Sequence, residues 1–387
     1  MQNFDFYNPT HIVFGKDRLN ELDDLVPKDA KVLILFGGGS VKKFGTFDKV
    51  VVALKNRTIV EFGGIEPNPK YETLIKAVDI IKKEKIDFLL AVGGGSVIDG
   101  TKFVNLAANY VGKDPTELLF NGRSGSITVP ISLPIGTVLT LPATGSEMNE
   151  WAVISYNHTK CVVRSPQLFP VFSLLDPTLT FTLPSVQVAN GIIDTFIHVV
   201  EQYVTFPTDW RFQDRTSEWI LQTLIEIGKK TLDNPRNYDA RANLMWCATM
   251  ALNRLIGAGV PQDWSAHIIG HELTAMFGID HWQTLAILQP IIWEVRKDKK
   301  RDKLLQFAER VWHITDGNDD IKIDSAINKT REFFEGLWIK THLSDYGIGK
   351  DKIDDIVTAL ENHSMTALSE TGDLTLDISR EILIKSL

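Results

Sequence analysis

The stretch "FLLAVGGGSVIDGTK" (88–102) joins a continuous apolar run to three glycines and a serine, followed by a segment with helical character. An apolar run of this length suits a buried strand and is too short for a helix. Glycines after such a strand let the chain turn sharply and let backbone N–H groups approach a ligand without a Cβ clash. The stretch therefore predicts a strand, a loop and a helix from about Val97 whose N-terminus favours a phosphate.

The same pattern recurs upstream, where "KVLILF" (31–36) also runs into "GGGS" (37–40). Further strands are expected at 58–62, 127–135 and 171–177, and a helix at 73–86. Uniformly apolar strands that alternate with amphipathic helices predict a parallel sheet covered on both faces.

The pattern changes near residue 185, beyond which the periodicity is helical. Helices are expected at 215–232, 239–259, 302–314 and 323–337. A chain of 387 residues is long enough for two domains. We therefore predict a Rossmann-like α/β domain over 1–185 that binds a dinucleotide, and an all-helical domain over 186–387 that binds metal and substrate.

Composition excludes several classes of protein. The net charge of −8 argues against nucleic acid or an anionic membrane as the main partner. The two cysteines, Cys161 and Cys247, form no CxxC motif, so neither a disulfide framework nor a cysteine zinc site is expected. The sequence has no signal-peptide pattern at its start and no run of about 18 apolar residues. These features predict a soluble cytoplasmic protein.

Neither glycine loop is GxGxxG, the usual dinucleotide fingerprint, so two ordinary tight turns are the alternative. Their occurrence twice in one sheet domain favours phosphate binding. The first loop has no acid for ribose hydroxyls, whereas Ser40, Lys42 and Lys43 are close to it. This favours NADP over NAD, although the lysines could equally belong to a solvated helix face.

Acid and imidazole groups recur at helical spacing in the second half. Asp194 and His198 are four residues apart, as are His267 and His271, and His281 follows ten residues later. Carboxylate with imidazole suits Fe(II) or Zn(II) better than calcium or magnesium. His198 could instead simply donate a hydrogen bond to Asp194. The pattern leaves open which three histidines bind, and the i,i+4 spacing favours His267 with His271.

Five segments resemble the iron-containing (group III) alcohol dehydrogenases, in the family's order: "AVGGGSVIDGTK" (91–102), "LTLPATGSE" (139–147), "DPTLTFTLP" (176–184), the Asp194/His198 helix and the segment with His267, His271 and His281. The resemblance covers essentially the whole chain and is strongest to the NADPH-dependent aldehyde reductase or butanol dehydrogenase branch. It implies the dehydroquinate synthase-like fold and hydride transfer between NADPH and short-chain aldehydes. It also implies a homodimer and one divalent metal, Fe(II) or Zn(II).

The resemblance also implies roles for individual residues. The metal ligands would be Asp194, His198, His267 and His281, in place of the pair favoured by spacing. His271 would stand beside the metal and relay protons. The residues implied for the cofactor are Gly38, Ser40, Gly94, Gly95, Ser96, Asp99, Thr140, Thr144, Lys160 and Leu179.

The sequence departs from the family's pattern at several bulky positions. Trp282 follows His281 where a glycine is usual, Glu150 and Trp151 replace small residues, and Trp264 comes shortly before His267. These side chains could narrow the substrate pocket or pack the core.

Three other functions are alternatives to this one. A dehydroquinate synthase-like lyase would need clustered Lys and Arg beside the ligand positions, which residues 190–290 do not offer. An NAD-dependent dehydrogenase of the same fold, including glycerol and glycerol-1-phosphate dehydrogenases, is a further alternative. A metal-stabilised binding protein would not need two glycine loops.

Overall fold

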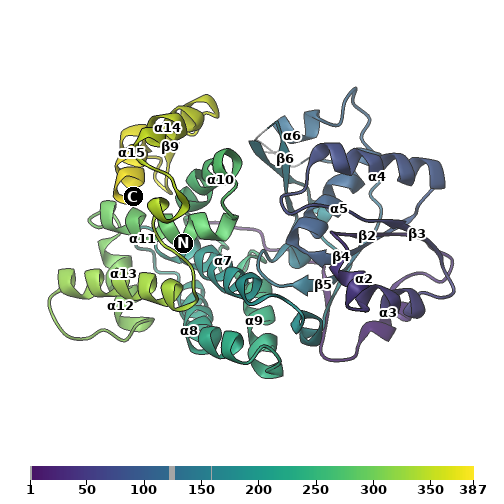
Figure 1. Ribbon diagram of the computed structural model, residues 1–387, viewed down its shortest axis with the longest axis horizontal. Coiled ribbons are helices and arrows are strands. Elements are labelled where there is room, and N and C mark those ends of the chain that lie inside the picture. Colours follow the sequence, from purple (N-terminus) through teal and green to yellow (C-terminus); the bar gives the residue numbers. More distant parts are fainter. Residues whose placement is uncertain (1, 122–126, 158) are drawn as a thin grey trace. The chain divides into compact units, whose positions relative to one another are not determined.

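The computed structural model describes residues 2–121, 127–157 and 159–387 (Figure 1). Contacts between residues divide the chain into two compact units. One unit, here the α/β unit, comprises 7–183 and 235–249. The other, the helical unit, comprises 1–6, 184–234 and 250–387.

The α/β unit is built on a six-stranded sheet in the order β1-β8-β5-β4-β2-β3, in which every neighbouring pair is parallel. The strands expected at 31–36, 58–62, 88–92 and 171–177 are confirmed. The six strands are β1 (His11–Phe14), β2 (Lys31–Phe36), β3 (Thr58–Phe62), β4 (Phe88–Gly94), β5 (Ile135–Leu141) and β8 (Phe172–Leu175).

The strand expected at 127–135 is wrong. Residues 127–134 are irregular, and the strand begins at Ile135. Pro130 and Pro134 interrupt the apolar run, and proline cannot donate a ladder hydrogen bond inside a sheet. The pairing therefore starts only after the second proline, with Ile135 opposite Leu89 of β4.

Helices cover both faces of the sheet, as predicted. Alternate residues of β2 enter different apolar clusters: Leu33 and Leu35 pack with α4 and α5, whereas Val32 and Ile34 pack with α1 and α3. The helices of this unit are α1 (Leu22–Leu25), α2 (Ser40–Lys43), α3 (Thr46–Ala53), α4 (Tyr71–Glu84), α5 (Gly95–Ala108), α6 (Glu117–Asn121) and α9 (Tyr238–Ala251).

An antiparallel hairpin was not anticipated from the sequence. It consists of β6 (Trp151–Tyr156) and β7 (Thr159–Arg164), with Trp151 opposite Arg164. The hairpin follows the "LTLPATGSE" segment and holds two of the positions singled out above, Trp151 and Lys160.

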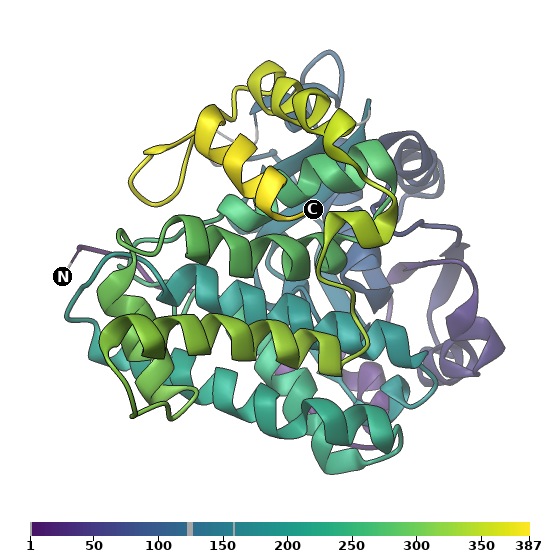
Figure 2. The same ribbon diagram turned by 60° about the vertical axis from the view of Figure 1, so that its left-hand side comes forward.

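The helical unit starts at α7, whose residues from Val188 to Tyr203 are all buried. Phe196 of α7 meets the rings of Phe307, Phe333 and Phe334, with centroids 5.5–6.4 Å apart. Figure 2 brings this unit forward. Its helices are α7 (Ser185–Tyr203), α8 (Arg211–Asp233), α10 (Ser265–Phe277), α11 (His281–Val295), α12 (Arg301–Arg310), α13 (Asp319–Gly336), α14 (Ile353–Asn362) and α15 (Leu376–Lys385), with a small ladder of β9 (Ala367–Leu368) and β10 (Leu374–Thr375).

Two segments pack with a different unit from the one that their position in the sequence predicts. The helix expected over 239–259 ends at Ala251, and residues 235–249 pack with the α/β unit, where Trp246 meets Phe14. Residues 1–6 pack with the helical unit, where Phe4 meets Trp210. In the parts of the chain that the structure describes, no helix is both long and apolar enough to cross a membrane.

Replacement of Gly136 by alanine should destabilise the sheet. A Cβ at Gly136 would lie 2.4 Å from Cζ of Phe172, whose ring is stacked on Phe88. Overpacking of this kind costs about 1–3 kcal/mol of unfolding free energy. Urea-induced unfolding should therefore show a lower midpoint for Gly136→Ala.

The matched control is Gly336→Ala, at the end of α13. Among the residues that the structure describes, nothing lies within 4 Å of a Cβ built there. Its unfolding midpoint should stay unchanged or rise slightly, because alanine is the better helix former. Equal midpoints for both variants and the wild type would contradict the close packing at Gly136.

Candidate functional site

Helix α7 brings the first two polar groups together inside the helical unit. Asp194 and His198 lie one turn apart on the same face, with relative exposures of 2% and 5%. His198 Nε2 lies 3.7 Å from Asp194 Oδ1, beyond ordinary hydrogen-bond length. Within the described residues, Asp194 Oδ1 accepts no hydrogen bond. A buried carboxylate oxygen in this state favours a cation as its partner.

The remaining histidines lie on the next helix pair. Helix α10 carries His267 and His271, and α11 begins at His281. Gly278 ends α10 with a φ of 70°, a left-handed conformation that glycine adopts without strain. The short link over 278–280 makes α10 and α11 packed neighbours, and the ring of His281 lies 5.0 Å from that of His267 between centroids.

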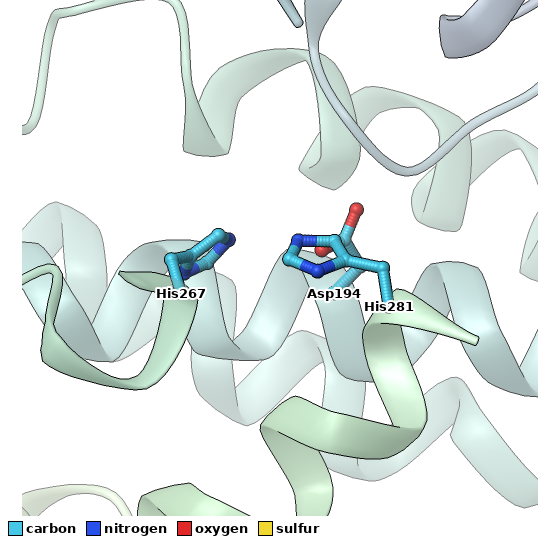
Figure 3. Close-up of side chains that lie close together, drawn as sticks. All are labelled: Asp194, His267 and His281. Carbon is cyan, nitrogen blue, oxygen red and sulfur yellow. The ribbon is translucent and has the colours of Figure 1, made fainter. Parts of the chain in front are cut away.

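Three of these side chains converge on one point. Asp194, His267 and His281 each offer a ligand atom, and these atoms lie within 4.8 Å of one another. Figure 3 shows the three side chains turned toward each other from α7, α10 and α11. One carboxylate and two imidazoles make a donor set that suits a borderline divalent ion such as Fe(II) or Zn(II).

His198 and His271 lie beside this group. The ring of His198 is stacked on that of His267, with centroids 4.9 Å apart. The ring of His271 lies 5.0 Å from that of His281 and 6.4 Å from that of His267. The structure therefore groups His267 with His281 and Asp194, not with His271 as the i,i+4 spacing favours.

Glu201 is a residue that the sequence reasoning missed. It lies on α7, its side chain is 1% exposed, and its Oε2 contacts His267 Nδ1. Burial raises the pKa of Glu201 well above its usual value, and the Asp263 carboxylate raises it further. The signal was present, because Glu201 follows Asp194 by seven residues and so lies on the same helical face.

The two glycine loops lie side by side in the α/β unit. They follow β2 and β4, which are adjacent parallel strands with Phe36 opposite Val92. The chain places β3 on one side of β2 and β4 on the other, so the order of the sheet reverses between β2 and β4. In open α/β sheets, ligands bind outside the carboxyl ends of the strands at such a switch point.

The second loop presents a helix N-terminus. Helix α5 begins at Gly95, two residues before the predicted start, and no side chain caps it within the described residues. A Cβ at Gly95 would lie 2.3 Å from Thr144 Oγ1, so only glycine permits this approach of the loop after β5. The uncapped start of α5 at Gly95 and Ser96 is a helix N-terminus of the kind that favours a phosphate, as a dinucleotide site needs.

Asp99 has partners within the protein. Its two carboxylate oxygens accept hydrogen bonds from Ser146 Oγ (2.6 Å) and Val153 N (2.9 Å). Burial raises the pKa of Asp99, and Lys102 opposes that shift. Asp99 therefore ties α5 to the loop before β6, besides any contact with a cofactor.

The other implied cofactor residues are spread over the α/β unit. Thr140 lies in β5 and Thr144 in the loop after it, at the edge that holds the second glycine loop. Leu179 lies in the short 3-10 helix Pro177–Thr180 that follows β8. Lys160 lies on β7 opposite Ser155 and is 8% exposed.

A carboxylate from strand β3 lies beside the first loop, and the sequence reasoning did not consider it. Gly38 and Ser40 are exposed, and no atom of the described residues lies within 4 Å of a Cβ built at Gly38. Lys42, however, donates a hydrogen bond to Glu61 of the neighbouring strand β3. Glu61 thus balances one of the two lysine charges that favoured NADP, which leaves Lys43 and Ser40.

Lys102 is a further residue without a predicted role. It is fully buried, and its Nζ lies 2.6–3.0 Å from five acceptors on Ser146, Asn149 and Trp151. Burial lowers the pKa of Lys102 to about 8. The ammonium group thereby fixes the loop over 146–151, which also bears the Asp99 contact.

The tryptophans noted in the sequence differ in their surroundings. Trp264 lies edge-on to His267, with ring centroids 5.3 Å apart, and donates a hydrogen bond to Gln262. Trp151 lies under the Arg164 guanidinium on the hairpin, and Trp282 is the second residue of α11. Trp264 therefore borders the Asp194, His267 and His281 group.

Two family models match the chain. Residues 9–177 match the iron-containing alcohol dehydrogenase model, and residues 188–370 match the C-terminal model of the Fe-containing alcohol dehydrogenase family. The chain is 57% identical to the NADPH-dependent aldehyde reductase YqhD of Escherichia coli over 99% of both chains. It is 38% identical to NADH-dependent butanol dehydrogenase B of Clostridium acetobutylicum over 95% of this chain and 94% of the relative.

The fold agrees with these matches. A crystal structure of E. coli YqhD superposes with a TM-score of 0.97 at 55% identity, over 100% of this chain and 99% of that one. The chain belongs to the iron-containing alcohol dehydrogenase family.

Replacement of Lys102 by methionine should strongly destabilise the α/β unit. The variant keeps the side chain's length but leaves buried carbonyl groups of Ser146, Asn149 and Trp151 without their shared donor. Removing one partner of a buried charged network costs about 3–5 kcal/mol of unfolding free energy. Urea-induced unfolding followed by circular dichroism measures this loss.

The control is Lys49→Met at an exposed position of α3. Its unfolding free energy should stay within about 0.5 kcal/mol of the wild type. A Lys102→Met protein as stable as this control would show that the loop holds its shape without the ammonium group.

Proposed function

We propose that this member of the iron-containing alcohol dehydrogenase family is a metal-dependent aldehyde reductase that transfers hydride between NADPH and short-chain aldehydes. The observation that carries the proposal is the convergence of Asp194, His267 and His281 in a protein that also has glycine loops at a sheet switch point. The 57% identity over nearly the whole chain to an enzyme named an NADPH-dependent aldehyde reductase supports the cofactor and the substrate class.

The metal ligands in this proposal are Asp194, His198, His267 and His281. Three of them share one point, and His198 stacks on His267 beside it. A divalent ion held there supplies Lewis-acid chemistry, which polarises a carbonyl oxygen and stabilises developing negative charge. Asp194 and the imidazoles fix the ion's position because they come from three packed helices.

The dinucleotide supplies the hydride, and the α/β unit binds and orients it. Backbone N–H groups of Gly94, Gly95 and Ser96 hold the pyrophosphate at the N-terminus of α5. Gly38 and Ser40 stand at the adenosine end, where Lys43 offers positive charge to a 2′-phosphate. Asp99, Thr140, Thr144, Lys160 and Leu179 complete the proposed cofactor set.

His271 is the proposed proton relay. Its ring lies 5.0 Å from the ring of His281 without being part of the convergent group. From there it can hold the proton that the alcohol product takes up. Trp264 lies edge-on to His267 and so borders the same group.

The family resemblance further supports a homodimer in the cytoplasm. Light scattering of the purified protein tests the dimer, and cell fractionation tests the location. An NAD-dependent enzyme of the same fold is the second candidate, because Glu61 balances the charge of Lys42 and because an NADH-dependent relative shares 38% identity.

The purified protein should oxidise NADPH in the presence of butanal faster than it oxidises NADH. A chelator should abolish this activity, and added Fe(II) or Zn(II) should restore it, because the polarising ion is held only by side-chain ligands. Absorbance at the reduced nicotinamide band measures both rates. Turnover with NADH alone would refute the NADPH preference, and turnover that survives complete metal removal would refute the metal-dependent mechanism.

His267→Ala should remove both bound metal and activity, whereas His271→Ala should lower turnover with normal metal content. The difference follows from the geometry, since only His267 belongs to the convergent group. General acid–base groups contribute about 10²–10⁴-fold to rate. Metal analysis with steady-state kinetics separates the two roles, and loss of metal from His271→Ala would make His271 a ligand.

A further inference from the structure

The first turn of α10 is held by two buried carboxylates. Asp263 accepts a hydrogen bond from Ser265 N at 3.0 Å, and Glu201 Oε1 accepts from Ala266 N at 3.0 Å and His267 N at 3.3 Å. The N–H of Ile268 bonds to the Trp264 carbonyl. The Ile268 bond is the first intrahelical bond of α10, and the carboxylates satisfy the N–H groups of Ser265, Ala266 and His267, which have no intrahelical partner.

Glu201 uses its two oxygens for different tasks. Oε1 serves the backbone N–H groups of Ala266 and His267, and Oε2 contacts Nδ1 of His267. One carboxylate thus fixes both the main chain and the ring of a single histidine. The hydrogen bonds from the N–H groups of His267 and Ala266 oppose the effect of burial and favour the ionised form of Glu201. The ionised oxygens can only accept, so Nδ1 carries the proton and the lone pair is on Nε2.

The position of Glu201 is itself secured. Its carbonyl accepts the N–H of Asp263 at 2.7 Å, and the Asp263 carboxylate pairs with Lys300, whose side chain is 2% exposed. Lys300 also bonds to Glu370 at 2.9 Å. A buried ammonium group with two carboxylates therefore locks the segment before α10 against the end of α7.

We propose that Glu201 is a positioning residue that holds His267 in the Nδ1–H tautomer and so sets the affinity of the metal centre. The inference rests on the ligand set proposed above. Groups that hold the far nitrogen of a ligating histidine typically change metal affinity about 10–100-fold when they are altered.

Glu201→Gln keeps the size and shape of the side chain but replaces one of its two oxygens by an NH₂ group. The amide group must therefore turn its oxygen either toward the backbone N–H groups or toward Nδ1 of His267. Its oxygen is needed by the two N–H groups of Ala266 and His267, which turns its NH₂ toward Nδ1. Nδ1 then becomes an acceptor, and the proton moves to Nε2, where it blocks a metal ion. In the opposite orientation the amide NH₂ would face the N–H groups of Ala266 and His267, and these donors would lose their acceptor.

The matched control is Glu272→Gln. Glu272 is also buried and its Oε1 contacts a histidine Nδ1, that of His363, at 2.8 Å. His363 belongs to no convergent ligand group among the described residues. The two variants therefore make the same chemical change to the same kind of pair, and only one pair includes a proposed ligand.

The experiment measures Zn²⁺ affinity of the metal-stripped, full-length proteins by competition with a chromophoric chelator. Glu201→Gln should weaken binding about 10–100-fold, and Glu272→Gln should leave it within about twofold. Nitrogen NMR of ¹⁵N-histidine-labelled, metal-free protein should show His267 as Nδ1–H in the wild type and as Nε2–H in Glu201→Gln. A purely structural role for Glu201 would not move the tautomer.

The same titration of His267→Ala distinguishes a failure of the role proposed for Glu201 from a failure of the proposed ligand set. If His267→Ala weakens Zn²⁺ binding and Glu201→Gln does not, the role of Glu201 is refuted while the ligand set stands. Weaker binding by Glu201→Gln with an unchanged tautomer also refutes that role. If His267→Ala binds Zn²⁺ like the wild type, the proposed ligand set fails, and the inference fails with it.

Discussion

The burial of the Asp194 carboxylate constrains the whole helical unit. It lies in a helix whose side chains are buried from Val188 to Tyr203, and its Oδ1 accepts no hydrogen bond within the described residues. Charge in such a place is costly without a counter-ion. Helices α10 and α11 bring His267 and His281 to Asp194, and together the three side chains could hold a cation that offsets this cost. A metal ion would therefore stabilise the unit in addition to any role in catalysis.

A second constraint acts on the α/β unit, where backbone groups must approach a ligand closely. Gly95 meets this need because no other residue fits against Thr144. The loop over 146–151 is then held from behind by Lys102 and Asp99. In both units a buried charged side chain fixes a neighbouring segment: Lys102 holds the loop over 146–151, and Glu201 holds the first turn of α10.

Much of this could be predicted from the sequence, because the deciding patterns are local. Four strands, the parallel sheet and the switch to helices follow from apolar runs and periodicity. The apolar run over 127–135 predicts a strand, but Pro130 and Pro134 lie within it. Proline cannot donate a hydrogen bond to a neighbouring strand, so this part of the prediction is wrong. The hairpin β6–β7 and the exchange of residues 235–249 into the α/β unit depend on contacts between distant segments, which periodicity does not contain.

The same limit applies to the candidate site. Spacing favoured His267 with His271, yet residues on one helical turn need not share a metal. The group containing His281 depends on the turn at Gly278 and on the packing of α10 against α11. The spacing from Asp194 places Glu201 on the ligand face of α7, but its contact with His267, 66 residues away, could not be predicted from that spacing.

Cofactor choice shows how a non-local contact changes a local argument. The segment "GGGSVKK" contains two lysines and no acid, which favours a 2′-phosphate. Glu61 reaches the same place from β3 and binds Lys42, while the Lys42 ammonium also lies over the rings of Phe36 and Phe47. Lys42 is thus held in place by the sheet edge. In the proposed cofactor site, discrimination between the two dinucleotides would then rest on Ser40 and Lys43, while Glu61 remains paired with Lys42.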